Sequence, residues 1–314
     1  MDMTAAAVKQ AAKEYGADLV GIASIDRFSA LAPERNPASI FPECRSVIVL
    51  ARRILRGAMR GIEEGTNFSS TYGMFGFRWL EDNFLAQTTY DLTCFLEAAA
   101  VEAVPLFGYF EEGMAKGVAV AQGKPAPNVI VDPHYAAQAA GLGEIGLGGF
   151  FLTPQYGLRQ RFALILTDAA LEADPVSDKR ICSDCGACAA ACPFGAMDAR
   201  NTRQVGVTGH EKPVATIDYE ICRSCPNGAM LGPGRGSRPD RLAAACARAC
   251  LVRLEQAGKC ANKFDQPFRK RPPWAVDLLR RPVDAAEGSR PADLGCGKNL
   301  DRIGQRDGSQ ETRP

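Results

Sequence analysis

The chain has 314 residues, of which 46% are hydrophobic and 23% charged, and its formal net charge is +1. This composition allows a large apolar core, and the near-zero charge gives no electrostatic reason to expect binding to nucleic acid or to an anionic membrane. The N-terminus has no apolar signal segment, and no apolar stretch approaches the ~20 residues of a membrane span, so the sequence predicts a soluble, cytoplasmic protein.

The first half of the chain alternates between helical and strand-forming patterns. Helices are expected over residues 4–15 and 77–103 and in a short segment that starts near His134. Strand patterns cover residues 18–23, 46–51, 104–110, 128–131, 149–152 and 161–167. A glycine-dense turn over residues 139–149 ends the short helix.

The composition changes at about Leu171, where the chain becomes rich in Cys, Gly and Pro and has few strand-length apolar runs. This change predicts a small domain organised by metal, over residues 173–274. Residues 275–314 are polar and are expected to form an extended or disordered tail. The basic and aromatic segment Phe268–Trp274 is interpreted as folding back on the core through its prolines and Trp274, with RNA contact as the alternative.

One run of cysteines is the most informative motif in the chain. Cys182, Cys185, Cys188 and Cys192 are spaced Cys-x2-Cys-x2-Cys-x3-Cys and are followed by proline. This is the bacterial ferredoxin spacing for a [4Fe–4S] cluster. A zinc site or a disulfide framework is the alternative, but zinc sites pair two separated Cys-x2-Cys units, and a disulfide-rich secreted protein is usually shorter.

Further cysteines supply ligands for a second cluster. Cys222 and Cys225 form a Cys-x2-Cys pair, and Cys246 and Cys250 lie one turn apart in a strongly helix-forming stretch. In two-cluster ferredoxins the fourth cysteine of each motif crosses to the other cube. We therefore predict one cluster on Cys182, Cys185, Cys188 and Cys250 (set one) and another on Cys192, Cys222, Cys225 and Cys246 (set two).

Two ligands of this assignment have an alternative role, and four other cysteines lie outside it. Cys246 or Cys250 could instead be an ordinary buried thiol, which is a common state of cysteine. Cys260 follows later in the chain. Cys44, Cys94 and Cys296 stand outside any ligand spacing and are expected to be core or loop residues.

Segments upstream of the cysteines carry a second pattern. They are Asp18–Ala23, Phe41–Leu50, the Ala-Gly-Leu-Gly-Glu-Ile-Gly block Ala140–Gly146, and Leu152–Arg161 followed by Thr167 and Asp168. In this order, and followed by the cysteine motifs, they resemble the superfamily of epoxyqueuosine reductases and reductive dehalogenases. The resemblance covers roughly residues 14–260, and the glycine block with the downstream Thr-Pro pattern is its more specific part.

The resemblance implies an α+β fold in which residues 1–172 form a nitroreductase-like domain that binds cobalamin, a corrinoid, with its base off. A small ferredoxin-like domain with two clusters follows, and in that superfamily the clusters deliver low-potential electrons to cobalt for reductive cleavage of a substrate. The expected corrinoid contacts are Gly141, Leu142, Gly143, Gly146, Arg159 and Arg161, since glycine lets backbone approach a flat macrocycle. A glycine-rich turn without a ligand and ordinary surface arginines are the alternatives.

Reductive cleavage also needs a proton donor. The acidic donor of epoxyqueuosine reductases would fall near Pro127, so this chain lacks it there. His134, Tyr109 and Tyr90 are the candidates, with Glu144 as a further one. For each of them a structural role, in the core or at a helix start, is the alternative.

Three functions are compatible with these patterns. The first is a cytoplasmic iron–sulfur and cobalamin reductase that acts on a small organic substrate and takes electrons from a low-potential donor such as ferredoxin or flavodoxin. The second is an electron-transfer protein that serves a partner enzyme without a corrinoid. The third, an epoxyqueuosine-type tRNA reductase, is disfavoured by the neutral charge and the lack of a helical-repeat tail.

Overall fold

The structure, a computed structural model, describes residues 3–107, 129–231 and 238–284, together with residues 118, 120–122 and 124. The α-helices are α1 (Ala5–Glu14), α2 (Arg60–Glu63), α3 (Ala86–Ala98), α4 (Pro133–Ala139), α5 (Ala187–Ala190), α6 (Tyr219–Arg223) and α7 (Ala245–Gln256). The strands are β1 (Leu19–Ser24), β2 (Ser46–Arg53), β3 (Ala103–Phe107), β4 (Glu144–Ile145), β5 (Phe151–Leu152), β6 (Gln160–Thr167), β7 (Met197–Val205), β8 (Lys212–Ile217), β9 (Ala275–Val276) and β10 (Pro282–Val283). Tyr109, Pro127, Cys296 and residues 285–314 lie outside the described residues.

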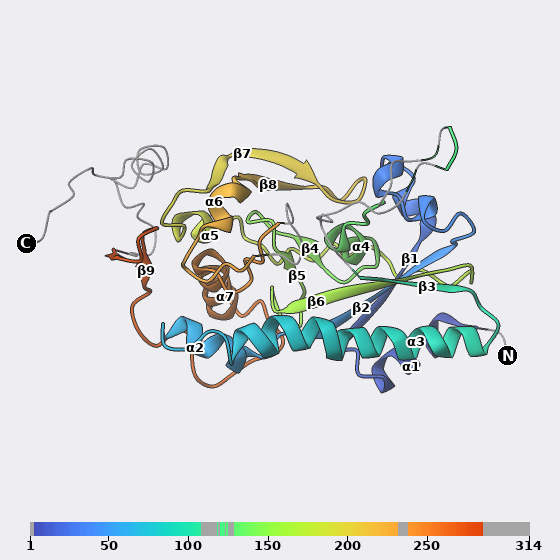
Figure 1. The fold of residues 1–314 in the computed structure, drawn as a ribbon, viewed down its shortest axis with the longest axis horizontal. Coiled ribbons are helices and arrows are strands. Elements are labelled where there is room, and N and C mark those ends of the chain that lie inside the picture. Colours follow the sequence, from blue (N-terminus) through green and yellow to red (C-terminus); the bar gives the residue numbers. More distant parts are fainter. Residues whose placement is uncertain are drawn as a thin grey trace, which may run out of the picture.

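A four-stranded antiparallel sheet in the order β1-β2-β6-β3 is the centre of the N-terminal part (Figure 1). The strands predicted over 18–23, 46–51 and 161–167 are confirmed, and β3 confirms the start of the one predicted over 104–110. The strand expected over 149–152 is reduced to the two residues of β5. The strand predicted over 128–131 is wrong for residues 129–131, which have no regular structure.

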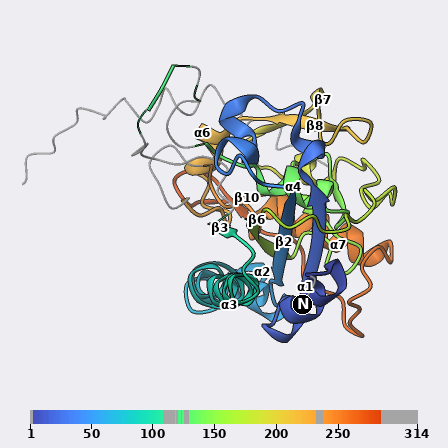
Figure 2. The same ribbon diagram turned by 90° about the vertical axis from the view of Figure 1, so that its right-hand side faces the viewer.

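Both faces of this sheet are buried, and side chains of β2 and β6 alternate between them. Ile48 and Ile165 pack toward α1 and α3 on one face, which Figures 1 and 2 show on the same side of the sheet. Val49 and Leu164 pack on the other face, with α4. This alternation is the period of a pleated strand, and burial on both faces explains why these strands are apolar throughout.

The long helical segment along the bottom of Figure 1 starts earlier than predicted. It begins with π-helical turns at Tyr72–Arg78 and Leu80–Leu85 and continues as α3 to Ala98, whereas the sequence predicted a helix over 77–103. A Cβ on Gly76 would lie 2.4 Å from the ring of Tyr72, so glycine is needed at this wide turn. Ala100, with a positive φ of 57°, ends the segment.

The cysteine-rich part shares a core with the sheet part. One apolar cluster contains Ile54 and Leu158 from the first part together with Met197, Ala215 and Leu251 from the second. The β7–β8 hairpin was not predicted, because β7 is largely exposed and has no apolar run. The domain boundary between residues 172 and 173 therefore remains a prediction. Apolar side chains from both sides of this boundary pack in the same core.

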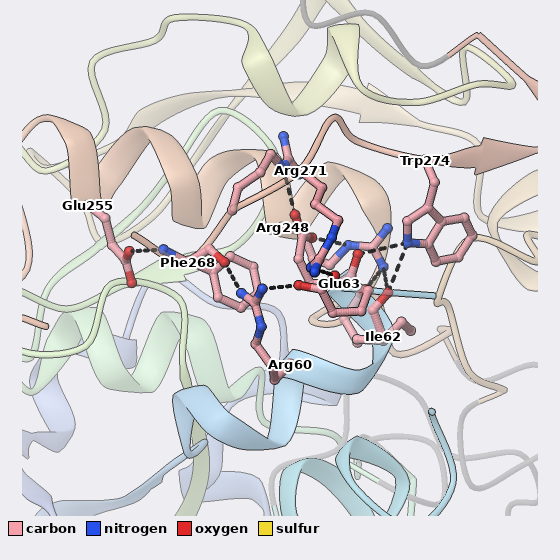
Figure 3. A network of polar contacts seen from close by, with 11 residues as sticks. Arg60, Ile62, Glu63, Arg248, Glu255, Phe268, Arg271 and Trp274 are labelled. Carbon is pink, nitrogen blue, oxygen red and sulfur yellow. Dashed lines mark hydrogen bonds and ion pairs between the residues drawn. The ribbon is translucent and has the colours of Figure 1, made fainter. Parts of the chain in front are cut away.

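The segment Phe268–Trp274 folds back on the core, as predicted. Phe268 is 1% exposed, and the Trp274 indole N–H donates to the carbonyl oxygens of Ile62 and Glu63, both at 3.0 Å (Figure 3). The Arg248 guanidinium lies 4.7 Å from the Trp274 ring centroid. These contacts tie the segment to α2 and α7.

The expected tail begins with an ordered turn, which corrects the prediction for residues 275–284. β9 and β10 pair antiparallel. The Asn227 side chain donates to the carbonyl of Val276 at 2.8 Å and accepts from its amide at 2.7 Å. No helix in the described part of the chain is long and apolar enough to cross a bilayer.

Candidate iron–sulfur site

The four thiols of set one line one small cavity. Cys182, Cys185, Cys188 and Cys250 all line it, together with Gly146, Leu147, Gly148, Phe150, Leu152 and Gly186. Three of these cysteines come from one loop and the fourth from α7. Four cysteine side chains are the ligand number of a [4Fe–4S] cluster, so the residues present fit this group.

Local backbone conformation brings the first three thiols together. Asp184 and Gly186 have positive φ values of 54° and 71°, which turn the chain tightly between Cys182 and Cys188. Burial is the largest cause that raises the pKa of the Cys188 thiol to about 12. A positively charged iron centre would therefore stabilise the thiolate form of Cys188.

Set two is gathered near Cys246, at the start of α7. Cys192 and Cys222 are both 9% exposed and pack in one apolar cluster with Cys225 beside them. Burial raises the pKa of the Cys222 thiol to about 12, and the charges of Cys246, Cys192 and Cys225 raise it further. Because Cys246, Cys192 and Cys225 all act on the pKa of Cys222, the four thiols of the predicted set lie near one another.

Helix α7 connects the two sets, because Cys246 belongs to one and Cys250, one turn later, to the other. Among the described residues, no group of three or more His, Cys, Asp or Glu side chains is arranged to hold a single metal ion. In a cube each thiolate binds a different iron atom, so the ligand sulfurs are spread around the cluster. Ligation by the eight cysteines stays a prediction.

Arg241 lies between the two sets and was not found from the sequence. Its side chain donates to the carbonyl of Gly148 at 3.0 Å, and its guanidinium lies 4.6 Å from the Phe150 ring centroid. Cys188 of set one and Cys246 of set two both stabilise its charge. Nη1 of Arg241 is buried and has no hydrogen-bond partner among the described residues. An unpaired N–H between two thiol sets fits a negatively charged occupant such as a sulfide-rich cluster.

Glu144 positions the cluster loop, which corrects its interpretation as a proton donor or helix cap. Its side chain is 2% exposed, and one carboxylate oxygen accepts from the amides of Ile181 and Cys182, both at 2.6 Å. The other oxygen lies 3.4 Å from the Lys212 ammonium. Glu144 therefore fixes the backbone of the first cluster ligand.

The glycine block packs closely against protein and the cysteine cavity. A Cβ on Gly141 would lie 2.2 Å from the Pro175 carbonyl oxygen, and one on Gly143 would lie 1.9 Å from that of Leu152. Gly146 approaches the Cys182 sulfur, and Leu142 packs into the apolar cluster under the sheet. The close approaches predicted from glycine exist and are to protein groups, and contact of these residues with a corrinoid stays a prediction.

A glycine substitution tests this packing. Gly143→Ala should lower the unfolding free energy by more than about 1 kcal/mol, because strand β5 must move away from the new methyl group. Gly57→Ala is the matched control, since nothing lies within 4 Å of its Cβ position. Thermal unfolding under anaerobic conditions measures both, and equal midpoints for the two variants would contradict the packing role.

His134 lies beside the sheet in an aromatic and cationic environment. Its ring centroid is 5.8 Å from that of Phe151 and 6.2 Å from that of Phe162. The ring is partly accessible, but the surrounding protein desolvates it and lowers the pKa of His134 to about 4, and Arg238, Arg241 and Arg161 lower it further. His134 is therefore neutral at pH 7, so an imidazolium proton donor is not available there.

Arg161 is engaged by protein groups, and its role in binding corrinoid stays a prediction. It lies 3.2 Å from Glu81 and 2.7 Å from Asp240, and it also donates to the Tyr72 hydroxyl and to the Gly76 carbonyl. Burial raises the pKa of Glu81 to about 7, against the opposing effect of Arg161. Glu81, missed by the sequence analysis, can thus hold a proton near neutral pH.

Arg159 and Tyr90 lie outside the His134 region. Arg159 is 1% exposed and donates to the carbonyl of Ile54 and to the Asn262 side chain, so it is a core residue. Tyr90 is 65% exposed on α3, which covers the opposite face of the sheet from α4. Tyr109 lies outside the described residues.

Comparisons with known proteins agree with the cysteine pattern and the fold. The 4Fe-4S dicluster domain family matches residues 181–254. A tetrachloroethene reductive dehalogenase from Desulfitobacterium hafniense is 33% identical over 94 residues, which are 29% of this chain and 15% of that protein.

A solved structure of a reductive dehalogenase has a similar fold. A catabolic reductive dehalogenase aligns with a TM-score of 0.50 and 18% identity over 92% of this chain and 41% of its own. Epoxyqueuosine reductase from Streptococcus thermophilus aligns with a TM-score of 0.45 and 19% identity over 61% of this chain and 52% of its own. The chain spans about half or less of the length of these relatives. Residues 181–254 of this chain therefore match a 4Fe-4S dicluster domain, and the fold of the chain is similar to that of a catabolic reductive dehalogenase.

Proposed function

We propose that the protein is an iron–sulfur reductase in which sets one and two each hold a [4Fe–4S] cluster and pass low-potential electrons to an acceptor bound beside His134. The observation that carries this proposal is the cavity of set one, which is lined by four thiols from two separate segments. Cys246 of the second set lies on the same helix, α7, as Cys250 of the first set, so the two clusters would be neighbours.

Strand β5 lies between set one and the His134 region, which indicates which cluster would transfer electrons to the acceptor. Phe150 and Leu152 line the cavity of set one, whereas Phe151 between them contacts the ring of His134. Successive side chains of a strand point to opposite faces, so a single layer of backbone separates set one from the His134 region. Set one would therefore be the cluster that faces the acceptor, and set two the cluster farther from it.

The His134 region suits an acceptor that becomes electron-rich. The charges of Arg161, Arg238 and Arg241 all act on His134, and the rings of Phe151 and Phe162 exclude water from one side. Buried cations stabilise negative charge that develops on reduction. Neutral His134 can donate a hydrogen bond to the acceptor or accept one from it.

Cobalamin is the acceptor that the sequence resemblance favours, and it would supply a strongly reducing cobalt centre. Among the residues predicted to hold it, the glycines and Arg159 pack against protein, and Arg161 is paired with Glu81 and Asp240. These protein contacts support a second candidate function, that of an electron-transfer protein without a corrinoid.

Corrinoid retention separates the two functions. The chain is reconstituted anaerobically with iron and sulfide, incubated with one equivalent of cobalamin and passed through a gel-filtration column. The reductase is expected to retain about one corrinoid per chain. Loaded clusters with no retained corrinoid would contradict cobalamin as the acceptor and leave electron transfer as the function.

A further inference from the structure

A groove beside set two offers a place where electrons can enter. It has a volume of about 790 Å³ and is lined by the turn after α2, by the Cys225 loop and by the segment that follows Trp274. Ile62, Phe68 and Trp274 form part of its apolar wall. Cys225 itself lines the groove, whereas Cys192, Cys222 and Cys246 are buried.

The groove lies at the far end of the electron path. Figure 1 shows β9, which contributes to the groove wall, on the opposite side of α7 from α4, which carries His134. Set two is the cluster on the groove side, and set one is the cluster on the His134 side. A donor bound in the groove would thus reduce set two first, and the electron would then move past α7 to set one.

The charge of the groove indicates what kind of partner fits. Among the described residues, its charged lining residues are Arg223 and Arg280, and no carboxylate lines it. Arg223 is paired with the exposed Glu220 on α6, and Arg280 is exposed on the turn between β9 and β10. Two guanidinium groups beside an apolar floor, one of them held in an exchangeable surface ion pair, are complementary to an acidic protein surface with an apolar centre.

We propose that this groove is the docking site of an acidic one-electron carrier protein, an inference that rests on the proposed function of set two. Docking brings the reduced centre of the carrier to Cys225. One electron passes from the carrier to the oxidised [4Fe–4S] cluster of set two, so the carrier is oxidised and the cluster is reduced by one electron, with no bond made or broken.

Charge-neutralising variants test this docking site. The double variant Arg223→Gln, Arg280→Gln removes both groove charges, and the double variant Arg200→Gln, Arg203→Gln removes two exposed charges from β7 as the matched control. An acidic bacterial ferredoxin, reduced beforehand, is mixed with each protein in a stopped-flow instrument at several salt concentrations. Dithionite reduction and iron content are measured on the same samples.

The groove variant is expected to be reduced by ferredoxin about tenfold more slowly at low salt, with a weaker salt dependence, because electrostatic steering is lost. The control should match the unmodified protein, and all three should be reduced equally by dithionite. Equal ferredoxin rates in both variants would place the entry elsewhere, for example at exposed Cys185, and would overturn the docking site. An unmodified chain that binds no cluster would overturn the proposed function and this inference together.

Discussion

Replacing Cys222 and Cys225 together by alanine should lower the iron content of the anaerobically reconstituted protein from about eight to about four atoms per chain. The double variant Cys182→Ala, Cys185→Ala should have the same effect. Each pair belongs to a different thiol set, so each double variant should lose one cube and keep the other. Iron and acid-labile sulfide analysis measures the loss.

The single variants Cys246→Ala and Cys250→Ala test the crossing of ligands on α7. Cys250 lines the set-one cavity, and Cys246 acts on the set-two thiols Cys222 and Cys225. Adding Cys250→Ala to the Cys182→Ala, Cys185→Ala variant should therefore leave the iron content unchanged. Adding Cys246→Ala to the same variant should remove the remaining cluster. Cys94→Ala, on an exposed position of α3, is the control that should keep all the iron. The opposite pattern for the two combinations would show that the ligands are exchanged.

Glu63→Gln should destabilise the protein by about 3–5 kcal/mol, because it leaves buried guanidinium groups without their counter-charge. The Glu63 carboxylate lies 2.9 Å from Nε of Arg248 and 2.6 Å from Nε of Arg269 (Figure 3 shows the former contact). The side chains of Glu63 and Arg248 are 5% and 2% exposed. Loss of the Glu63–Arg248 ion pair should also release the segment Phe268–Trp274, which packs over this pair.

Glu64 provides the matched control for this substitution. It follows Glu63 in sequence and pairs with Arg60 and with the exposed Arg271, so Glu64→Gln should cost at most about 1 kcal/mol. Thermal unfolding of the cluster-loaded protein should show a clearly lower midpoint for Glu63→Gln, by roughly 6–20 °C. Similar midpoints for the two variants would contradict a buried ion pair as the anchor of this segment.

The sequence predicted the features that depend on local spacing. Cysteine spacing indicated both thiol sets, because ligands on one loop or one helix turn are placed by the backbone that carries them. The strands β1, β2 and β6 and the helix α1 were predicted because burial leaves a clear apolar pattern. Trp274 and the prolines before it indicated a segment that packs on the core, and it does.

The features that were missed depend on contacts between distant segments. Glycine density at 141–146 indicated close backbone approaches, but it could not show that the partners are Pro175, Leu152 and Cys182. Arg241 belongs to no motif, and only the fold places it between the two sets. The raised pKa of Glu81 likewise results from burial beside Arg161. The exposed, polar strand β7 left no apolar pattern to detect.

Electron transfer through both sets to an acceptor beside His134 is tested most directly by rapid mixing. Protein with both clusters reduced is mixed anaerobically with one equivalent of aquacobalamin, which can take two electrons, one from each cluster. The expected result is reoxidation of both clusters in a single turnover, with loss of the fast phase in the Cys182→Ala, Cys185→Ala variant. Clusters that stay reduced, or that are reoxidised equally fast without set one, would contradict the proposed path.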